Sequence, residues 1–163
     1  MANDQKWMKE ALKEAKVAFS KKEVPIGAVV VYEDQVIGRG HNQIESLNDA
    51  TAHAEVLAIT AASNGLNSWR LTGCTLYVTA EPCIMCAGAI FLARIDRLVF
   101  GAFDPKKGGA GSLYNILKDE RLNHQAEVVS GVLEKECSNI LSIFFEEIRK
   151  EKVTDNGGDH LDG

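Results

Sequence analysis

Apolar and polar residues repeat along the chain with two periods, one typical of helices and one of strands. Residues 4–20 carry apolar side chains at the spacing of an amphipathic helix, namely Trp7, Met8, Ala11, Leu12, Ala15, Ala18 and Phe19. Two strand-like runs follow at 26–32 and 35–39, and Glu33-Asp34 between them is short enough for a hairpin. Residues 49–63 are largely apolar and predict a buried helix.

The second half of the pattern predicts a strand-helix-strand unit. Strand-like residues at 74–79 and 97–100 flank a helical run at 83–93, so the two strands should be parallel. A short run at 127–130 predicts a fifth strand. A closing helix follows, and its core stripe consists of Leu133, Cys137, Ile140, Leu141, Phe144 and Ile148. We therefore expect an α/β fold of three layers, α/β/α, with a mixed five-stranded central sheet.

Length and composition favour a single domain. The 163 residues, 45% of them hydrophobic, suffice for one sizeable core. That domain should span residues 1–153, whereas residues 154–163 are polar, acidic and glycine-containing, which predicts a disordered tail. The chain starts without a signal-peptide pattern, and no apolar run is long enough to cross a bilayer. We expect a cytoplasmic protein with reduced thiols, in which Cys74 and Cys137 are small core residues.

The charge of the chain argues against a strongly basic, nucleic-acid-binding surface. The formal net charge is -5, and three of the negative charges belong to Asp155, Asp159 and Asp162 in the predicted tail. Local basic residues remain at 106–107 and 149–152, and the simplest interpretation of them is an ordinary solvated surface. Composition alone therefore does not indicate an RNA substrate.

Two motifs together indicate metal chemistry. His53-Ala54-Glu55 and Pro82-Cys83-Ile84-Met85-Cys86 supply three zinc ligands, and these are His53, Cys83 and Cys86. A structural zinc site closes with four protein ligands, whereas a catalytic one uses three and keeps a position for water. Glu55 is a carboxylate that the metal does not need. The count therefore favours a catalytic zinc site with Glu55 as its general acid/base.

The predicted helices allow these ligands to converge. His53 falls in the first turn of the helix at 49–63, for which Asp49 or Thr51 is the expected cap. Pro82 suits the entrance of the next helix, whose first turn presents both thiols where the helix dipole favours negative charge. Taken alone, Cys-x-x-Cys is equally compatible with a redox pair, half of a structural zinc site or chance. His-x-Glu combined with Pro-Cys-x-x-Cys is the signature of zinc-dependent nucleobase deaminases.

Further stretches of the chain point to one family within that group. They are Pro25-Ile26-Gly27-Ala28, His41-Asn42, Thr51-Ala52-His53-Ala54-Glu55, Leu76-Tyr77-Val78-Thr79, Glu81-Pro82-Cys83-Ile84-Met85-Cys86-Ala87-Gly88-Ala89, Gly101-Ala102-Phe103-Asp104 and Gly109-Ala110-Gly111-Ser112-Leu113. Over residues 7–150 the chain resembles the bacterial tRNA-specific adenosine deaminases. The zinc motif is common to the whole cytidine and deoxycytidylate deaminase superfamily, whereas residues 101–113, 122–124 and 144–145 resemble the tRNA enzymes more than the free-base enzymes.

The resemblance implies a cytidine-deaminase-like fold and hydrolytic deamination of the wobble adenosine, position 34 of a tRNA anticodon loop, to inosine. It also implies a zinc-activated hydroxide with one Zn²⁺ per subunit, an arginine tRNA as the typical substrate, and a homodimer. The implied site comprises the ligands His53, Cys83 and Cys86, the proton shuttle Glu55, and the substrate-binding residues Asn42, Ala54 and Asp104. We add Phe145 to the substrate-binding set, because it falls off the core stripe and is available for base stacking or a dimer contact.

Several of these assignments have structural or functional alternatives. Asn42 also fits the cap of a strand end, and Asp104 before Pro105 is a common turn residue. Residues 108–111 lack the ending of a phosphate loop, so we expect a flexible surface turn there. A free-base deaminase acting on guanine or cytosine would use the same zinc chemistry. A noncatalytic, zinc-stabilised RNA-binding module is disfavoured by Glu55, since a scaffold gains nothing from an acid beside an open metal site.

Overall fold

The structure is a computed structural model and describes residues 3–155. In chain order the elements are α1 (Asp4–Ser20), β1 (Gly27–Tyr32), β2 (Gln35–His41), α2 (Ile44–Leu47), α3 (Ala54–Leu66), β3 (Thr75–Ala80), α4 (Ile84–Leu92), β4 (Arg97–Ala102), η1 (Ile116–Lys118), β5 (Glu127–Val129) and α5 (Glu134–Asp155). The predicted order of helices and strands is confirmed. The pattern missed only α2 and the 3-10 helix η1, which are four and three residues long.

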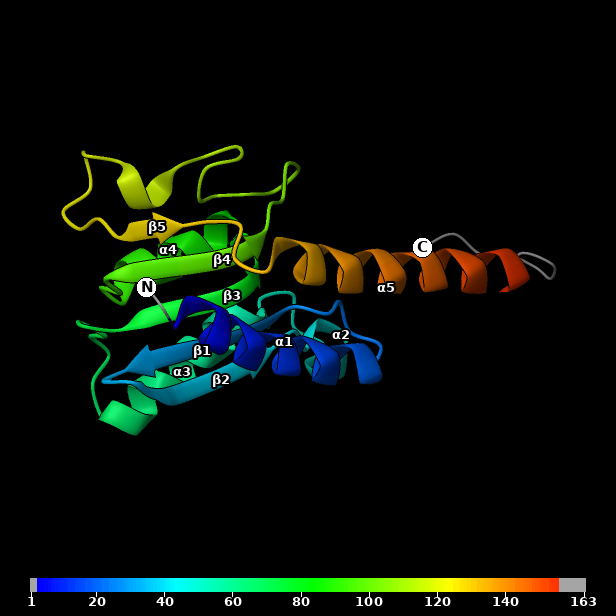
Figure 1. Ribbon diagram of the computed structural model, residues 1–163, viewed down its shortest axis with the longest axis horizontal. Helices are drawn as coiled ribbons and strands as arrows, with labels where there is room; N and C mark the ends of the chain where they lie inside the picture. The colour runs from blue at the N-terminus through cyan, green and yellow to red at the C-terminus, as the bar shows by residue number, and fades with distance from the viewer. Residues whose placement is uncertain (1–2, 156–163) are drawn as a thin grey trace.

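The strands form one mixed sheet with the order β2-β1-β3-β4-β5. β1 pairs antiparallel with β2 and β3, whereas β3, β4 and β5 are parallel to one another. In Figure 1, α1 and α5 lie in front of the sheet, and α3 and α4 lie behind it. The predicted three-layer architecture is confirmed, as is the parallel pairing of β3 and β4 across α4.

Each face of the sheet has its own apolar core. Behind the sheet, α3 contributes small side chains, and these are Ala54, Ala58 and Ala62. In front, Trp7 and Met8 of α1 pack against Val29 and Tyr77 of the strands. Cys74 lies in the rear core and Cys137 in the front core, both fully buried, as the sequence predicts.

Two glycines of β2 let α3 lie directly on the sheet. A Cβ atom on Gly40 would collide with the carbonyl oxygen of Ala54, and one on Gly38 would collide with the carbonyl oxygen of Ala58. Glycine is the residue that allows such a close approach of backbones. The first turn of α3 is therefore held at a fixed height above the end of β2, and this turn carries the candidate catalytic residues.

The helix predicted at 49–63 begins later, at Ala54. Before it, the carboxylate of Asp49 accepts hydrogen bonds from the backbone N–H and the hydroxyl of Thr51, at 2.8 and 2.7 Å. The N-cap position is held by His53, which has an extended backbone. The predicted caps Asp49 and Thr51 are therefore wrong, because their side chains are used within a local turn that competes with the helix.

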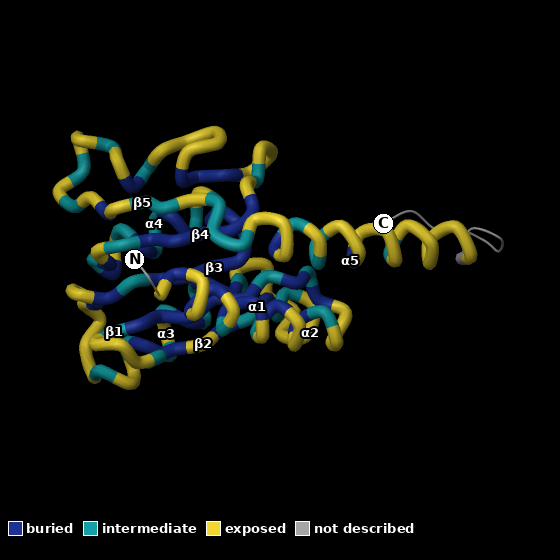
Figure 2. Tube along the Cα trace, in the orientation of Figure 1, coloured by how far each residue is buried: buried dark blue, intermediate teal, exposed yellow. Residues whose placement is uncertain are grey.

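The closing helix α5 is 22 residues long and extends beyond the edge of the sheet (Figure 1). Figure 2 shows that most of this extension is exposed. The predicted tail starts at Thr154, within the last turn of α5, and its residues 156–163 lie outside the described residues. Across residues 3–155 no helix combines the length and the apolar character that a membrane span requires.

Candidate active site

Three potential metal ligands meet at the N-termini of α3 and α4. His53 and Cys83 occupy the N-cap positions of these helices, and Cys86 lies in the first turn of α4. The Nδ1 atom of His53 is 3.7 Å from Cys83 Sγ and 3.5 Å from Cys86 Sγ. The structure thus brings together all three ligands proposed from the sequence, at helix ends whose partial positive charge favours thiolates.

The arrangement of these atoms fits a zinc ion. All three ligand atoms lie within 4.8 Å of one another. Around a tetrahedral zinc, with Zn–S near 2.3 Å and Zn–N near 2.0–2.1 Å, a sulfur and a nitrogen ligand are separated by about 3.6 Å. The two separations between His53 and the thiols agree with that value. Three protein ligands leave one tetrahedral position for water, which is the pattern of a catalytic zinc site.

The two thiols differ in their affinity for protons. The hydrogen bond with Cys86 lowers the pKa of Cys83 to about 3, and the same contact, together with burial, raises the pKa of Cys86. The hydrogen bond with Cys83 raises the pKa of His53. The lowered pKa favours the thiolate form of Cys83, in which cysteine binds metal, and a bound cation would displace the remaining proton from the cluster.

Glu55 is a buried carboxyl group beside this cluster. It is the second residue of α3, and only 4% of it is exposed. Burial raises the pKa of its carboxyl to about 7, from an ordinary value of 4.5. An acid whose pKa is close to the working pH can both accept and return a proton during a reaction. Glu55 and His53 line the same cavity, so the carboxyl group faces the space where a substrate would enter.

Asn42 connects the end of β2 to the start of α3. Its amide oxygen accepts a hydrogen bond from the backbone N–H of Ala54 at 2.8 Å, and 4% of the residue is exposed. The bond satisfies one of the N–H groups that a helix N-terminus leaves unpaired. The same bond orients the amide, whose NH₂ group is a donor. Asn42 thus has a structural role, but its side chain caps the start of α3 and not the strand end that the sequence suggested, and it also lines the cavity.

The cavity beside the ligands has a volume of about 380 Å³. It brings together residues that are distant in the sequence, because Asp104 follows β4 and Phe145 belongs to α5, and both line it with Asn42. Ala54 is different. Its side chain is fully buried in the rear core, and its N–H group is the donor to Asn42. A substrate-binding role for Ala54 stays a prediction.

Two residues of the cavity wall were not predicted from the sequence. Lys107, interpreted as solvated surface, lines the cavity, and so does Glu81, for which no role was predicted. The surface turn expected at residues 108–111 is wrong for its first three residues, because 108–110 are buried. The signal was available in Glu81, a carboxylate that stands directly between a buried strand and Pro82.

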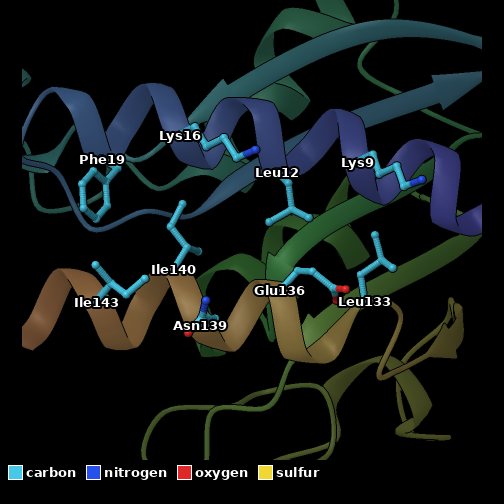
Figure 3. Close-up of a pocket in the computed structure, with 9 residues that line it drawn as sticks. All are labelled: Lys9, Leu12, Lys16, Phe19, Leu133, Glu136, Asn139, Ile140 and Ile143. Carbon is cyan, nitrogen blue, oxygen red and sulfur yellow. The ribbon is translucent and has the colours of Figure 1, made fainter.

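A larger hollow lies elsewhere, between α1 and α5 (Figure 3). Its volume is about 540 Å³, and apolar residues such as Leu12 and Ile140 line it together with Lys9, Lys16 and Glu136. None of the proposed ligands or substrate-binding residues borders it. The chemistry therefore belongs to the smaller cavity at the ends of α3 and α4.

Comparison with known families agrees with this geometry. The model of the MafB19-like deaminase family matches residues 2–149. The chain belongs to this deaminase family. Among curated relatives of this deaminase, the tRNA-specific adenosine deaminase of Bacillus subtilis (strain 168) is 59% identical over 152 residues, covering 93% of this chain and 94% of the relative. The tRNA-specific adenosine deaminase of Aquifex aeolicus (strain VF5) is 50% identical over 147 residues, covering 90% of this chain and 97% of the relative.

Solved structures of deaminases share the fold. A structure from a study of A-to-I editing by tRNA:A34 deaminases at the wobble position superposes with a TM-score of 0.80 at 47% identity, covering 83% of this deaminase and 98% of that chain. The guanine deaminase of Nitrosomonas europaea superposes with a TM-score of 0.75 at 23% identity, covering 86% of this chain and 83% of the guanine deaminase chain. The second likeness shows the fold alone, whereas the first is accompanied by substantial sequence identity.

Proposed function

We propose that this enzyme deaminates the wobble adenosine at position 34 of a tRNA anticodon loop to inosine and releases ammonia. The observation that carries the proposal is one cavity lined by His53, Glu55 and Cys83 in a chain 59% identical to a tRNA-specific adenosine deaminase. An arginine tRNA is the substrate we would test first, because the family resemblance implies it.

The metal in this proposal is one Zn²⁺ per subunit, held by His53 Nδ1 and the sulfurs of Cys83 and Cys86. Zinc bound there would lower the pKa of water from 15.7 towards about 7 and would so supply a nucleophile at neutral pH. The fit of the three ligand atoms to a tetrahedral site supports zinc.

Glu55 moves the protons in this proposal. Its buried carboxyl group, with a pKa of about 7, accepts a proton from water and transfers it to N1 of the adenine as a C6–O bond forms. It then takes the remaining proton from the new hydroxyl group on C6 and passes it to the amine, so that the C6–N bond breaks, ammonia leaves and the C6 oxygen becomes the carbonyl of inosine. A single group can do both because Glu55 lines the same cavity as His53 and Cys83, where the water and the base would meet.

Asn42 and Phe145 would hold the base. The NH₂ group of Asn42 is a donor at the cavity wall, and Phe145, 43% exposed, offers a ring for stacking. Phe144 packs edge-on against Phe145, with ring centroids 5.4 Å apart, and so restricts its orientation. An adenosine must leave its stack to enter such a cavity, which costs least in a single-stranded loop. An anticodon loop meets that requirement.

One face of α5 continues the cavity outward. Leu141 and Phe145 line the cavity, and Arg149 and Lys152 follow at the spacing that places them on the same side of the helix. Both cations are exposed. Glu147 and Glu151 instead border a hollow next to the end of α1. A helix face that is cationic beyond the cavity suits the phosphates of an RNA stem.

We further propose that the enzyme is a homodimer that associates through α4. Ile84 and Leu92 are 56% and 63% exposed, and Gly88 lies between them on the same side of the helix. A Cβ on Gly88 would meet no atom within 4 Å, so this surface is open. Leu92→Glu should give a monomer in light scattering, whereas Leu47→Glu at an exposed position on α2 should not. If Leu92→Glu is still a dimer in light scattering, the interface lies elsewhere.

The activity is tested by incubating zinc-loaded protein with an anticodon stem-loop that carries adenosine at position 34. Free guanine, cytosine and cytidine are incubated in parallel, and inosine and ammonia are measured. Inosine in the RNA, without turnover of the free bases, is the expected result. Turnover of a free base with unmodified RNA would keep the deaminase chemistry and overturn the substrate.

A further inference from the structure

Glu81 is a buried carboxylate that stands between β3 and the metal-binding segment. Only 4% of it is exposed, and it is separated from Cys83 by Pro82 alone. No ion pair to Glu81 is present among residues 3–155. Burying a carboxylate without a cation is costly unless hydrogen bonds compensate it. Its partners therefore indicate why this residue is acidic.

Within residues 3–155, every hydrogen bond to the Glu81 carboxylate comes from the segment after β4. Its Oε1 atom accepts from the N–H of Asp104 at 3.1 Å and from the hydroxyl of Ser112 at 2.5 Å. Its Oε2 atom accepts from the N–H groups of Ala110 and Ser112, at 3.2 and 3.0 Å. One carboxylate thus binds both ends of the segment 104–112, which we call the clamp loop.

The clamp loop also lies flat on the metal-binding segment. The N–H of Gly109 donates to the carbonyl oxygen of Pro82 at 2.7 Å, and a Cβ on Gly109 would come within 3.0 Å of the backbone of Cys83. A Cβ on Gly108 would collide with the carboxylate of Glu81 itself. Because glycine has no Cβ, Gly108 leaves room for the Glu81 carboxylate and Gly109 leaves room for the backbone of Cys83.

The clamp loop carries part of the wall of the cavity that His53 and Cys83 also line. Asp104 and Lys107 line the cavity, and the Asp104 carboxylate accepts hydrogen bonds from the N–H groups of Lys106 and Lys107, both at 3.1 Å. The position of this wall relative to Cys83 is therefore set through Glu81.

We propose that Glu81 is a positioning residue that fixes the clamp loop against the metal-binding segment, so that the loop is ordered before the nucleotides around the target base arrive. This inference rests on the proposed RNA substrate. None of the hydrogen bonds found for the Glu81 carboxylate goes to His53, Cys83 or Cys86, so we expect Glu81 to contribute to RNA binding and not to the chemical step. A preordered wall avoids the entropy of ordering the loop on binding.

The test compares Glu81→Gln with two other variants. Glu81→Gln keeps the shape of the side chain, but it replaces one carboxylate oxygen with an NH₂ group. The N–H groups that donate to that oxygen then lose their acceptor. We expect KM for the A34 stem-loop to rise about tenfold or more, kcat to stay within about twofold, and zinc to stay at one per subunit. Ser112→Ala should raise KM less, because the other donors remain. Asp4→Asn, which alters a buried carboxylate paired with Arg97 far from the cavity, should leave KM unchanged.

Hydrogen exchange of the clamp loop provides a readout that does not depend on activity. Amides of residues 104–112 should exchange faster in Glu81→Gln, while those of α3 keep their protection. An unchanged KM and unchanged exchange in a folded, zinc-loaded Glu81→Gln would overturn the proposal. Should that variant not fold, Gly108→Ala, which pushes the loop off the carboxylate, must show the same rise in KM and in exchange, or the proposal fails. Absence of RNA turnover by the unmodified protein would refute the substrate, and faster exchange would still support the clamp.

Discussion

The amide oxygen of Asn42 accepts a hydrogen bond from the backbone N–H of Ala54, at 2.8 Å. The bond joins the first residue after β2 to the first residue of α3. It therefore holds the helix turn that carries His53 and Glu55 against the strand end, and it leaves the NH₂ group of Asn42 as a donor for a base.

Two substitutions separate these roles of Asn42. Asn42→Asp keeps an acceptor for the Ala54 N–H and removes the NH₂ donor, so stability should stay close to that of the parent while RNA deamination falls. Asn42→Ala removes both groups and should also lose about 1 kcal/mol of unfolding free energy, the usual cost of losing a helix cap. Urea unfolding and inosine formation measure the two effects. Full activity of Asn42→Asp would show that the NH₂ group of Asn42 does not bind the substrate.

Glu55→Gln should fold and bind zinc but lose turnover. Glutamine fills the same space and cannot accept a proton, so kcat should fall by about 10²–10⁴-fold. Inosine formation and metal analysis are the measurements, with Glu33→Gln in the exposed hairpin as the matched control. A Glu55→Gln enzyme with normal kcat would end the assignment of Glu55 as the proton shuttle.

Replacement of the four cysteines should divide them into two pairs. Cys83→Ala and Cys86→Ala each remove one of three ligands, so both should lose zinc and activity. Cys74→Ala and Cys137→Ala remove buried thiols from the two cores, and they should keep zinc while losing some stability. Metal content and thermal unfolding of the four variants test this division. Retention of zinc by Cys83→Ala would mean that the metal lies elsewhere.

The ion pair between Asp4 and Arg97 should make stability depend on acid pH. Both carboxylate oxygens accept from the guanidinium at 2.7 Å, and this holds the pKa of Asp4 below its usual 3.8. Since the folded-state pKa is lowered, the pair stabilises the fold above the unfolded pKa, and that stability is lost as pH falls through the folded pKa. Asp4→Asn should cost about 2 kcal/mol at pH 7.

Urea unfolding of parent and Asp4→Asn between pH 7 and pH 3 measures the effect of this pair. The difference between them should shrink as the pH falls below 4. Glu10→Gln, which alters a more exposed ion pair with Arg39, should cost less at neutral pH. A difference that is constant with pH would show that the Asp4 charge does not stabilise the fold.

Gly40→Ala tests the close approach of α3 to β2. The added methyl would collide with the carbonyl oxygen of Ala54, so α3 must shift. We expect a loss of about 1–3 kcal/mol in unfolding free energy, typical of overpacking, and a fall in activity because Glu55 moves with the helix. Equal stability and activity of the variant would show that the helix tolerates displacement.

The sequence predicted the main elements because their apolar residues follow one clear period. The stripe of α1 and the parallel unit β3–α4–β4 are examples, and the metal ligands were found because His53, Cys83 and Cys86 have chemistry and spacing that few other patterns share. The start of α3 was misplaced, since a local turn at Asp49 and the long-range bond from Asn42 decide it.

The position of Glu81 before Pro82 was a signal for a role, but the clamp loop that Glu81 binds could not be predicted, for the same physical reason. Its order depends on hydrogen bonds from Asp104 and Ser112 to Glu81, over 23 and 31 residues of sequence, and no local pattern records them. The glycines of that loop indicate a flexible turn when read locally. In the fold they are the residues that allow the backbone to lie on a buried carboxylate.

The most direct test of the central claim is a position-resolved measurement of inosine. A full-length arginine tRNA with adenosine at position 34 is incubated with zinc-loaded enzyme, digested, and analysed by mass spectrometry, and Glu55→Gln is run alongside. We expect inosine at position 34, no conversion at the other adenosines of the loop, and no inosine with Glu55→Gln. An unmodified position 34, with free guanine or cytosine turned over by the same preparation, would contradict it.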